Sequence, residues 1–341
     1  MADKEPFVKH LYTADPSAHV FNGKLYVYPS HDRETDIKSN DKGDQYDMND
    51  YHVFSMDEVG GPVTDHGVVL KADDIPWVSR QLWAPDAAAK NGKYYLYYPA
   101  RDKQDVFKIG VAVGDKPEGP FKPEPEPIKG TFSVDPAVFV DDDGQAYLYF
   151  GGLWGGQLQC YANGAFDGSQ LGAVEPSTGA ALHAKVAKLT DDMLSLASPV
   201  TDVVINDAST SQPIAATDHA RRFFEAAWLH KYNGKYYFSY STGDTHYLAY
   251  AISDSPLGPF TYGGRILEPV VGWTTHHSIA EFKGKWYLFY HDASLSGGEN
   301  HLRCAKIREI VYDAEGKIHL AEPQPQIKPP PAKLEEAAAA A

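Results

Sequence analysis

The chain has 341 residues, and 31 Lys and Arg stand against 46 Asp and Glu, which gives a formal net charge of −15 at pH 7. A surface this acidic repels phosphate groups, so nucleic acid and anionic membranes are poor candidates for partners. Hydrophobic residues make up 43% of the chain, as in globular proteins, and no apolar run reaches the ~18 residues of a membrane span.

The N-terminal segment has neither the basic nor the apolar region of a secretion signal, which predicts a cytoplasmic protein. The two cysteines, Cys160 and Cys304, cannot form a disulfide framework, and we expect both to be buried as small apolar residues. The tail 323–341 shows no apolar periodicity. We therefore interpret it as a linker or appended segment outside a folded domain at 1–322.

A glycine-centred turn recurs five times, each time between an apolar segment and an aromatic one. The turns are Asn22-Gly23, Asn91-Gly92, Asp143-Gly144, Asn233-Gly234 and Lys283-Gly284. Asn-Gly and Asp-Gly between strands are strong hairpin signals, because both turn positions need a positive φ. The turn glycines are 69, 52, 90 and 50 residues apart. A propeller blade needs roughly 40–50 residues, so each repeat can hold four strands and insertions.

A second repeat supports this division. Ile109–Val113 followed by Gly119-Pro120-Phe121 matches Leu248–Ile252 followed by Gly258-Pro259-Phe260, at a similar distance from the preceding hairpin. We interpret each copy as the third strand of a blade and the turn that leaves it. The sequence therefore predicts an all-β fold, a five-bladed β-propeller forming a single domain. The alternative is a β-sandwich, which would leave the paired repeats unexplained.

Chemically active side chains stand at one place in the repeat. Asp15, Asp135, Glu225 and His276 lie eight or nine residues before their turn glycines, and Trp83 takes this place in the second repeat. The first strand of each propeller blade lines the central channel, so these side chains are expected to converge. Asp before Pro is also a common turn starter, which is a structural explanation for the two aspartates.

Glu225 is harder to explain structurally, because it interrupts an apolar run in which an unpaired carboxylate costs several kcal/mol. Glycoside hydrolysis needs one protonated carboxyl and one ionised carboxylate, and a nearby like charge keeps a carboxyl protonated. We predict Glu225 as the general acid and Asp15 as the general base. Asp135 is then expected to raise the pKa of Glu225 and to orient it.

Five motifs follow one another in this repeat phase. They are Thr13-Ala14-Asp15-Pro16, Trp83-Ala84-Pro85-Asp86, Val134-Asp135-Pro136, Phe224-Glu225-Ala226 and His276-His277-Ser278. With these motifs the sequence resembles family 43 of the glycoside hydrolases, over nearly the whole chain to about residue 322. The resemblance implies a five-bladed propeller and an inverting reaction, which needs acid and base carboxyls roughly 6.5–9.5 Å apart.

The other candidate site residues have more than one interpretation. The resemblance implies a divalent cation, usually Ca²⁺ with Mg²⁺ or Mn²⁺ as alternatives, held by His276; His277 and a purely structural histidine remain open. It also implies that Arg303 contacts sugar hydroxyls, the alternative being a surface salt bridge. By its position, Trp83 offers an apolar face to a sugar ring or packs within its blade. His31, directly after the first aromatic strand, is a weaker candidate for substrate binding.

Two acidic stretches, 41–50 and 141–144, lack the ligand pattern of a calcium loop, and we interpret both as solvated loops. The predicted activity is that of an exo-acting, inverting β-D-xylosidase on small oligosaccharides, with arabinofuranose as a candidate second product. The alternatives are an arabinan-cleaving member of the same family and a carbohydrate-binding propeller without catalysis. The sequence leaves homo-oligomerisation open.

Overall fold

Each glycine-centred turn closes a hairpin in the computed structural model, which describes residues 4–334. In four of the five turns the residue before the glycine also has a positive φ, from 47° at Asn233 to 54° at Asn91. This is the backbone that two-residue hairpin loops require. In four cases the hairpin joins the first two strands of a four-stranded sheet. In the other case the sheet has a fifth, short strand added at its far edge.

The five sheets use strands that are consecutive in the sequence. The first contains β1 (Tyr12–Phe21), β2 (Lys24–Asp32), β3 (Asp50–Met56) and β4 (Thr64–Lys71). The second contains β5 (Asp86–Lys90), β6 (Lys93–Arg101), β7 (Phe107–Gly114) and β8 (Lys122–Pro123). The third contains β9 (Ala137–Val140), β10 (Ala146–Phe150), β11 (Ala184–Lys188) and β12 (Thr201–Val203).

The fourth sheet contains β14 (Glu225–Tyr232), β15 (Lys235–Ser241), β16 (Leu248–Ser253) and β17 (Phe260–Leu267), with β13 (Ile205–Asn206) parallel to β17 at its edge. The fifth contains β18 (His277–Phe282), β19 (Lys285–Asp292), β20 (Cys304–Tyr312) and β21 (Ile318–Leu320). Short 3₁₀ turns are η1 (Ala72–Asp74), η2 (Trp154–Gly156), η3 (Leu158–Tyr161), η4 (Gly168–Gln170), η5 (Gly243–Thr245) and η6 (Ser294–Ser296).

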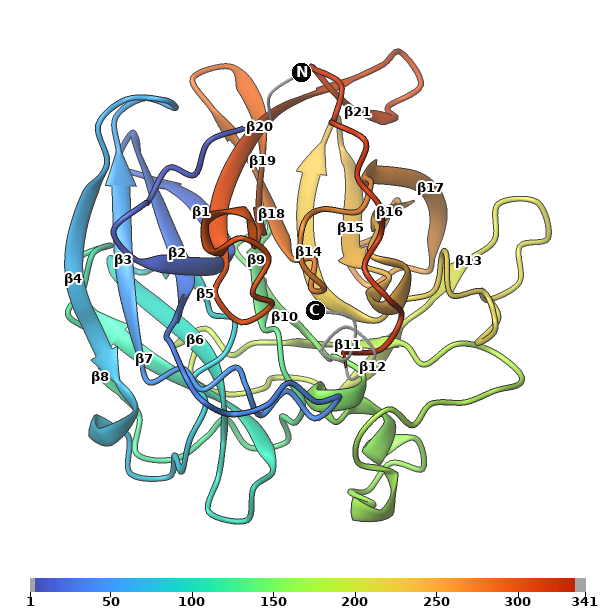
Figure 1. Ribbon diagram of the computed structural model, residues 1–341, viewed down its shortest axis with the longest axis horizontal. Helices are drawn as coiled ribbons and strands as arrows, with labels where there is room; N and C mark the ends of the chain where they lie inside the picture. Colours follow the sequence, from blue (N-terminus) through green and yellow to red (C-terminus); the bar gives the residue numbers. More distant parts are fainter. Residues whose placement is uncertain (1–3, 335–341) are drawn as a thin grey trace.

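The sheets are arranged around a centre as blades, which confirms the five-bladed β-propeller (Figure 1). The repeated strands β7 and β16 are third in their blades, as the paired sequence repeats predict. Among the described residues no helix is long and apolar enough to cross a membrane.

The hydrophobic core lies between neighbouring blades. Tyr28 and Tyr51 of the first blade pack with Leu96 and Tyr98 of the second, in one buried cluster. A similar cluster joins the second and third blades, and a larger one joins the third, fourth and fifth. The aromatic second strands therefore hold the ring together. Both cysteines are free and buried, as expected.

Within residues 4–334 the ring closes without a shared strand, because no sheet there combines strands from the first and last blades. Direct hydrogen bonds join the first and last blades instead. The Thr13 N–H donates to the Arg303 carbonyl (2.9 Å) and the Ala18 N–H donates to Ser278 Oγ (2.9 Å). Apolar residues of both blades, including Leu25 and Phe289, form a further buried cluster. The first and last blades are thus held together by packing and these local bonds.

Candidate active site

Asp15 is aimed into the centre of the ring by a β-bulge. The pairing of β1 with β2 slips between Ala14 and Ser17, and Asp15 itself has a φ of +49°. A bulge of this kind re-aims a side chain, and a positive φ on a residue other than glycine is uncommon. The Ser30 hydroxyl donates to Asp15 Oδ2 (2.5 Å), which holds the carboxylate in place.

Asp135 and Glu225 are held side by side by the backbone of their two blades. Asp135 has a φ of +58°, and its Oδ2 accepts the N–H of Ala226 (2.8 Å). The register of β14 slips between Glu225 and Trp228, and Ala226 has a φ of +64°. Strained backbone thus occurs at all three carboxylates or beside them, as is common at functional sites.

Gly152 makes room for this pair. A Cβ at residue 152 would lie 2.6 Å from the Val134 side chain, 3.3 Å from Glu225 Cβ and 3.7 Å from Asp135 Oδ2. The backbone of Gly152 is held in place, because its N–H donates to Ser133 Oγ (3.0 Å). A side chain at position 152 would therefore push on the two carboxylates.

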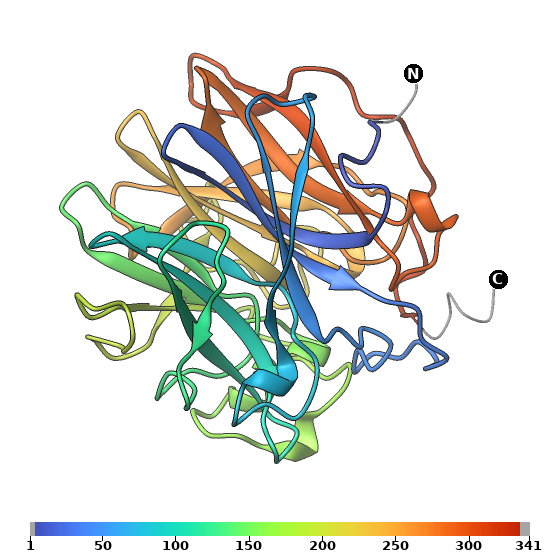
Figure 2. The same ribbon diagram turned by 90° about the vertical axis from the view of Figure 1, so that its left-hand side faces the viewer.

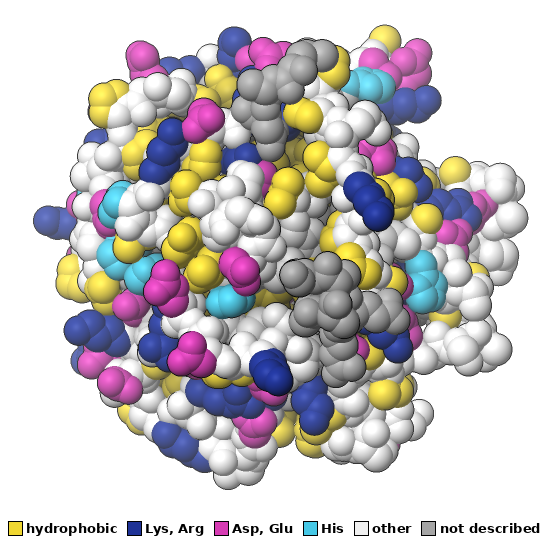
Figure 3. All heavy atoms as spheres, viewed as in Figure 1, with side chains coloured by type: hydrophobic (Ala, Val, Ile, Leu, Met, Phe, Trp, Pro, Cys, Tyr) yellow, Lys and Arg dark blue, Asp and Glu magenta, His cyan; other side chains and the backbone are white. Residues whose placement is uncertain are grey.

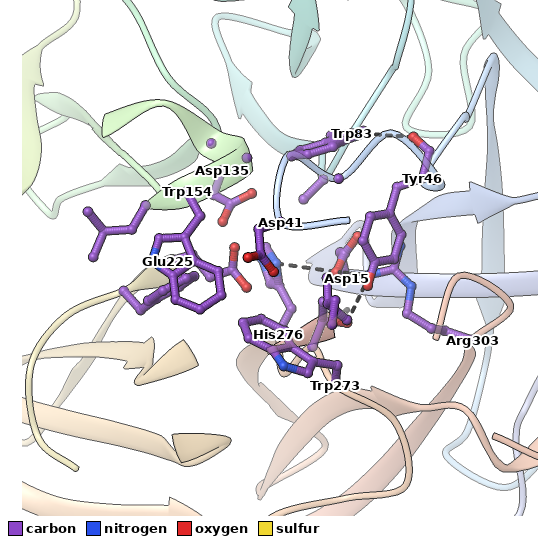
Figure 4. Close-up of a pocket in the computed structure, with 18 of the residues that line it drawn as sticks. Asp15, Asp41, Tyr46, Trp83, Asp135, Trp154, Glu225, Trp273, His276 and Arg303 are labelled. Carbon is purple, nitrogen blue, oxygen red and sulfur yellow. Dashed lines mark hydrogen bonds and ion pairs between the residues drawn. The ribbon is translucent and has the colours of Figure 1, made fainter. Parts of the chain in front are cut away.

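The three carboxylates line one cavity that opens to solvent. Figure 4 shows Asp135 and Glu225 on one side of it and Asp15 with Arg303 on the other. The further lining residues are Asp41, Gly43, Tyr46, Met48, Trp83, Ala84, Leu153, Trp154, Gly155, Gly156, Phe224, Trp273, Thr274, His276 and Leu334. The loop that carries Asp41 and the end of the described chain lie on the same face of the ring (Figure 2).

The pKa of Asp15 is shifted in the opposite direction from the pKa values of its two partners. Burial alone would raise the pKa of Asp15, but Arg303, His276 and His291 outweigh it and lower the pKa to about 2. Arg303 Nη1 lies 3.2 Å from Asp15 Oδ1, and the nearest His276 nitrogen lies 3.4 Å from the same oxygen. Asp15 is therefore ionised at neutral pH.

Asp135 and Glu225 are shifted in the opposite direction. Burial, with the Asp15 charge adding to it, raises the pKa of Asp135 to about 6, although His276 and the Ala226 N–H oppose the rise. Burial and the neighbouring Asp135 raise the pKa of Glu225 well above its usual range. Glu225 remains partly exposed to the cavity, so its proton can reach a bound molecule. One cavity thus holds an ionised carboxylate and a protonated carboxyl.

Arg303 is buried and belongs to the cavity, not to the surface. Its Nε and Nη2 donate to the two oxygens of Asp32 (2.8 and 2.7 Å), and Asp32 also accepts the Arg303 backbone N–H (2.9 Å). Asp32 ends β2 and is fully buried. The forked contact fixes the guanidinium so that Nη1 faces Asp15, and Tyr46 lies under it with 4.8 Å between the guanidinium carbon and the ring centre.

The two adjacent histidines point to different places. His276 lines the cavity, between Asp15 and Asp135, whereas His277 is fully buried with its Nε2 at 2.6 Å from Ser239 Oγ. Burial lowers the pKa of His277 well below its usual range, so it remains neutral. Of the two, only His276 is placed to meet a ligand in the cavity.

Trp83 serves packing and the cavity together. Its ring centre lies 4.6 Å from that of Phe107, its Nε1 donates to the Tyr46 carbonyl (2.8 Å), and one face lines the cavity. Gly43 approaches so closely that a Cβ there would lie 2.6 Å from the Trp83 ring. The loop 33–49 and Trp83 therefore shape this wall together.

Two lining residues, Asp41 and Trp154, escaped the sequence-based reasoning because they lie outside the repeat frame. Trp154, Phe224 and Trp273 form an aromatic wall, with ring centres 5.2 to 6.0 Å apart. Trp154 has a φ of +53°, which is a strained conformation for a bulky residue. Asp41, which we assigned to a solvated loop, lines the cavity instead. For Trp154, its place directly before Gly155-Gly156 was the available signal.

Two further expectations differ from the observed positions. His31 is not among the residues that line the cavity; its Nδ1 lies 2.5 Å from Asp50 Oδ1 in the first blade. The segment after residue 322 was expected to lie outside the fold, but its described part packs on the propeller. The Ala332 carbonyl accepts the Trp273 Nε1 proton (3.1 Å), and Leu334 lines the cavity. Residues 335–341 of the tail lie outside the described residues.

Comparison with known proteins identifies relatives over almost the whole chain. The family model described as Glycosyl hydrolases family 43 matches residues 6–318. The "Xylosidase/arabinosidase 43A" of Humicola insolens is 70% identical over 94% of this chain and 99% of its own length. The "Xylosidase/arabinosidase" of Bacteroides ovatus is 58% identical over 93% of this chain and 97% of its own length.

Solved structures are also similar to this chain over almost its whole length. CoXyl43, a β-xylosidase/α-arabinofuranosidase from a compost microbial metagenome, was solved with xylotriose in a calcium-free form. It superposes with a TM-score of 0.91 at 61% identity, covering 93% of this chain and 96% of that one. The RS223 β-xylosidase superposes with a TM-score of 0.90 at 55% identity, covering 96% and 99% of the two chains.

Proposed function

Because the chain belongs to family 43 of the glycosyl hydrolases, we propose that Asp15, Asp135 and Glu225 hydrolyse terminal glycosidic bonds of xylo-oligosaccharides with inversion. The chain is a glycoside hydrolase of the xylosidase/arabinosidase type, like its relatives of 70% and 58% identity. A small xylo-oligosaccharide is its substrate class, and a relative of this chain has been solved with xylotriose.

The opposite pKa shifts of Asp15 and Glu225 in one cavity carry the assignment of roles. An ionised Asp15, with its pKa at about 2, can accept a proton from water at neutral pH. A protonated Glu225 can donate to the oxygen of the leaving sugar. These are the two carboxyl states that an inverting glycosidase needs. Figure 4 shows the two side chains on opposite sides of the cavity, where a sugar ring and a water would lie between them.

The remaining residues act through these two. Asp135 stabilises the protonated state of Glu225 by its negative charge and holds the backbone at Ala226, next to Glu225. Arg303, clamped by Asp32, keeps Asp15 ionised. The guanidinium also borders the cavity, so its remaining edge can meet sugar hydroxyls. Trp83 supplies an apolar face on which a sugar ring can lie.

Two substrates that differ in their leaving group test the assignment of Glu225 as the general acid. Glu225→Gln is expected to lower kcat/KM about 10³-fold on xylobiose, whose leaving group needs a proton, and only about 10-fold on dinitrophenyl xyloside, whose leaving group does not. Glu281→Gln, an exposed residue of β18, is the matched control and should change neither rate. Equal losses on both substrates would remove Glu225 from the acid role. NMR of the first product should show α-xylose from a β-xyloside; β-xylose would exclude inversion.

We also propose that His276 binds a divalent cation of the calcium type. The fit rests on one imidazole that faces the cavity beside two carboxylates, so water would supply most of the six to eight ligands of Ca²⁺. Such a cation would add positive charge near the carboxylates. Chelation followed by metal-free dialysis should lower activity, and added Ca²⁺ should restore it in the wild type but not in His276→Ala. Full activity after chelation would contradict this role.

A further inference from the structure

A second group of potential metal ligands lies away from the cavity, on the first blade. His31 is near the end of β2, Asp50 begins β3, and His52 follows two residues later. One ligand atom from each of the three lies within 4.8 Å of the others. Residues two apart on a strand share a face, which explains why Asp50 and His52 meet His31 together. Figure 3 shows histidine side chains on the left of the view, over the first blade.

The donor set suits a transition metal. Two imidazoles and one carboxylate are ligands that Zn²⁺ accepts, with water in a fourth position. The His31 Nδ1 and Asp50 Oδ1 are 2.5 Å apart, and the His31 and His52 ring centres are 4.9 Å apart. Tetrahedral ligands at about 2.05 Å from Zn²⁺ stand about 3.3 Å apart. The metal would take the place of the hydrogen between His31 Nδ1 and Asp50 Oδ1, and these two atoms would move apart by about 0.8 Å.

His52 carries the supporting contact that metal-bound histidines usually have. Its Nδ1 lies 2.9 Å from Asp65 Oδ1 in β4, which leaves Nε2 as the nitrogen able to bind a metal. Asp65 is itself fixed, because the Gly67 N–H donates to Oδ1 (2.8 Å) and His10 Nε2 lies 2.8 Å from Oδ2. A carboxylate behind the ligand in this way fixes the ring and its tautomer. A simple surface ion pair would not need this second carboxylate.

Comparison with a second cluster shows what sets this one apart. Glu175, His219 and Asp244 also bring three ligand atoms within 4.8 Å. There Arg222 donates to Glu175 (3.1 Å) and Asp244 (3.0 Å), so a guanidinium already supplies the positive charge. Within residues 4–334, no Lys or Arg forms an ion pair with Asp50. The side chains of His31, Asp50 and His52 are 20%, 26% and 13% exposed, which gives a metal a path from solvent.

We propose that His31, Asp50 and His52 form a zinc-type metal site, separate from His276 and from the catalytic cavity. The metal would tie β2 to β3 and, through Asp65, to β4. It would therefore stabilise the first blade. It would also fix the chain next to Asp32, the residue that clamps Arg303.

Binding of Zn²⁺ to metal-stripped protein, in competition with a chromophoric chelator, tests the site. We expect the wild type and His276→Gln to bind a zinc ion that His31→Gln and His52→Gln bind at least 100-fold more weakly. Asp65→Asn should weaken binding about 10- to 100-fold, as loss of a supporting carboxylate does. His319→Gln removes an exposed histidine that also pairs with an aspartate and is the matched control.

Two further measurements test whether the metal binds at His31, Asp50 and His52. Co²⁺ in this site should give the visible absorption of a tetrahedral complex, and it should disappear in Asp50→Asn, a variant that changes little in size. Zn²⁺ should raise the melting temperature of the wild type and of His276→Gln but not of His52→Gln. Zinc binding that survives in His31→Gln and His52→Gln, that disappears in His276→Gln, or that is absent from the wild type would overturn the proposal.

Discussion

Asparagine at Asp135 should make the protein more stable at neutral pH, whereas asparagine at Asp15 should make it less stable. The pKa of Asp135 rises from 3.8 to about 6 through burial in the folded protein. The folded state therefore binds more protons than the unfolded state between these values, and stability falls as the pH rises through this window. At about 1.4 kcal/mol per pH unit, the ionised Asp135 costs about 3 kcal/mol at pH 7.5.

The pKa shift of Asp15 has the opposite effect on stability. Its pKa falls from 3.8 to about 2, because Arg303 and two histidines outweigh the effect of burial. Its contribution to stability is present above pH 3.8 and is lost as the pH falls toward 2, and it amounts to about 2 kcal/mol at pH 7.5. Two identical substitutions in one cavity are thus expected to change stability in opposite directions.

Thermal unfolding in metal-free buffer measures both effects. An unfolding entropy of about 2.1 cal/mol/K per residue gives about 0.7 kcal/mol/K for a chain of this size. Asp135→Asn should then raise the melting temperature by about 4 °C at pH 7.5, and Asp15→Asn should lower it by about 3 °C. At pH 4.5 the Asp135→Asn gain should shrink to about 1 kcal/mol, while the Asp15→Asn loss should remain near its full size.

Asp73→Asn, at an exposed position in η1, should change stability by less than about 0.5 kcal/mol and controls for the chemistry of the substitution. Shifts of the same sign at Asp15 and Asp135, or an Asp135→Asn gain that does not depend on pH, would refute the reasoning. Both variants should lose catalytic activity. Asp135→Asn should therefore become more stable while it loses activity.

Gly243→Ala and Arg303→Met, each with a matched comparison, probe the support of the site. Gly243→Ala places a Cβ 2.1 Å from Phe224 Cγ at a φ of +71° and should cost about 2–4 kcal/mol in thermal unfolding. Gly234→Ala, with a φ of +75° and no atom within 4 Å, should cost only about 1 kcal/mol. Arg303→Met leaves Asp32 buried and unpaired and should cost about 3–5 kcal/mol, and adding Asp32→Asn should recover most of it. Recovery would be absent if the guanidinium were needed mainly for packing.

The architecture could be predicted because its information is local. A hairpin turn needs glycine at a positive φ, and five such turns in one phase define five blades. The same phase brought Asp15, Asp135 and Glu225 to comparable places, because the first strand of every blade borders the centre. Where a residue belongs to the repeat, its position can be counted along the sequence.

Residues in insertions could not be placed by counting. Asp41 belongs to the loop between β2 and β3, and Trp154 to the connection after β10, so neither has an equivalent in the other blades. Their positions depend on contacts made after folding, such as Gly155 against the Lys42 carbonyl, where a Cβ would lie 2.8 Å away. His31 shows the same limit, because its partner Asp50 lies across a loop of irregular structure.

The seam between the first and last blades passes through the catalytic centre. Asp15 comes from the first strand of the chain and Arg303 from the last blade, 288 residues later, and they meet only once the ring is complete. A nascent chain with four blades would carry Asp15 without Arg303 and His276, which stand beside it in the complete ring. Hydrolysis would therefore begin only after the fifth blade has been synthesised and docked, so that the onset of activity during translation reports completion of the ring.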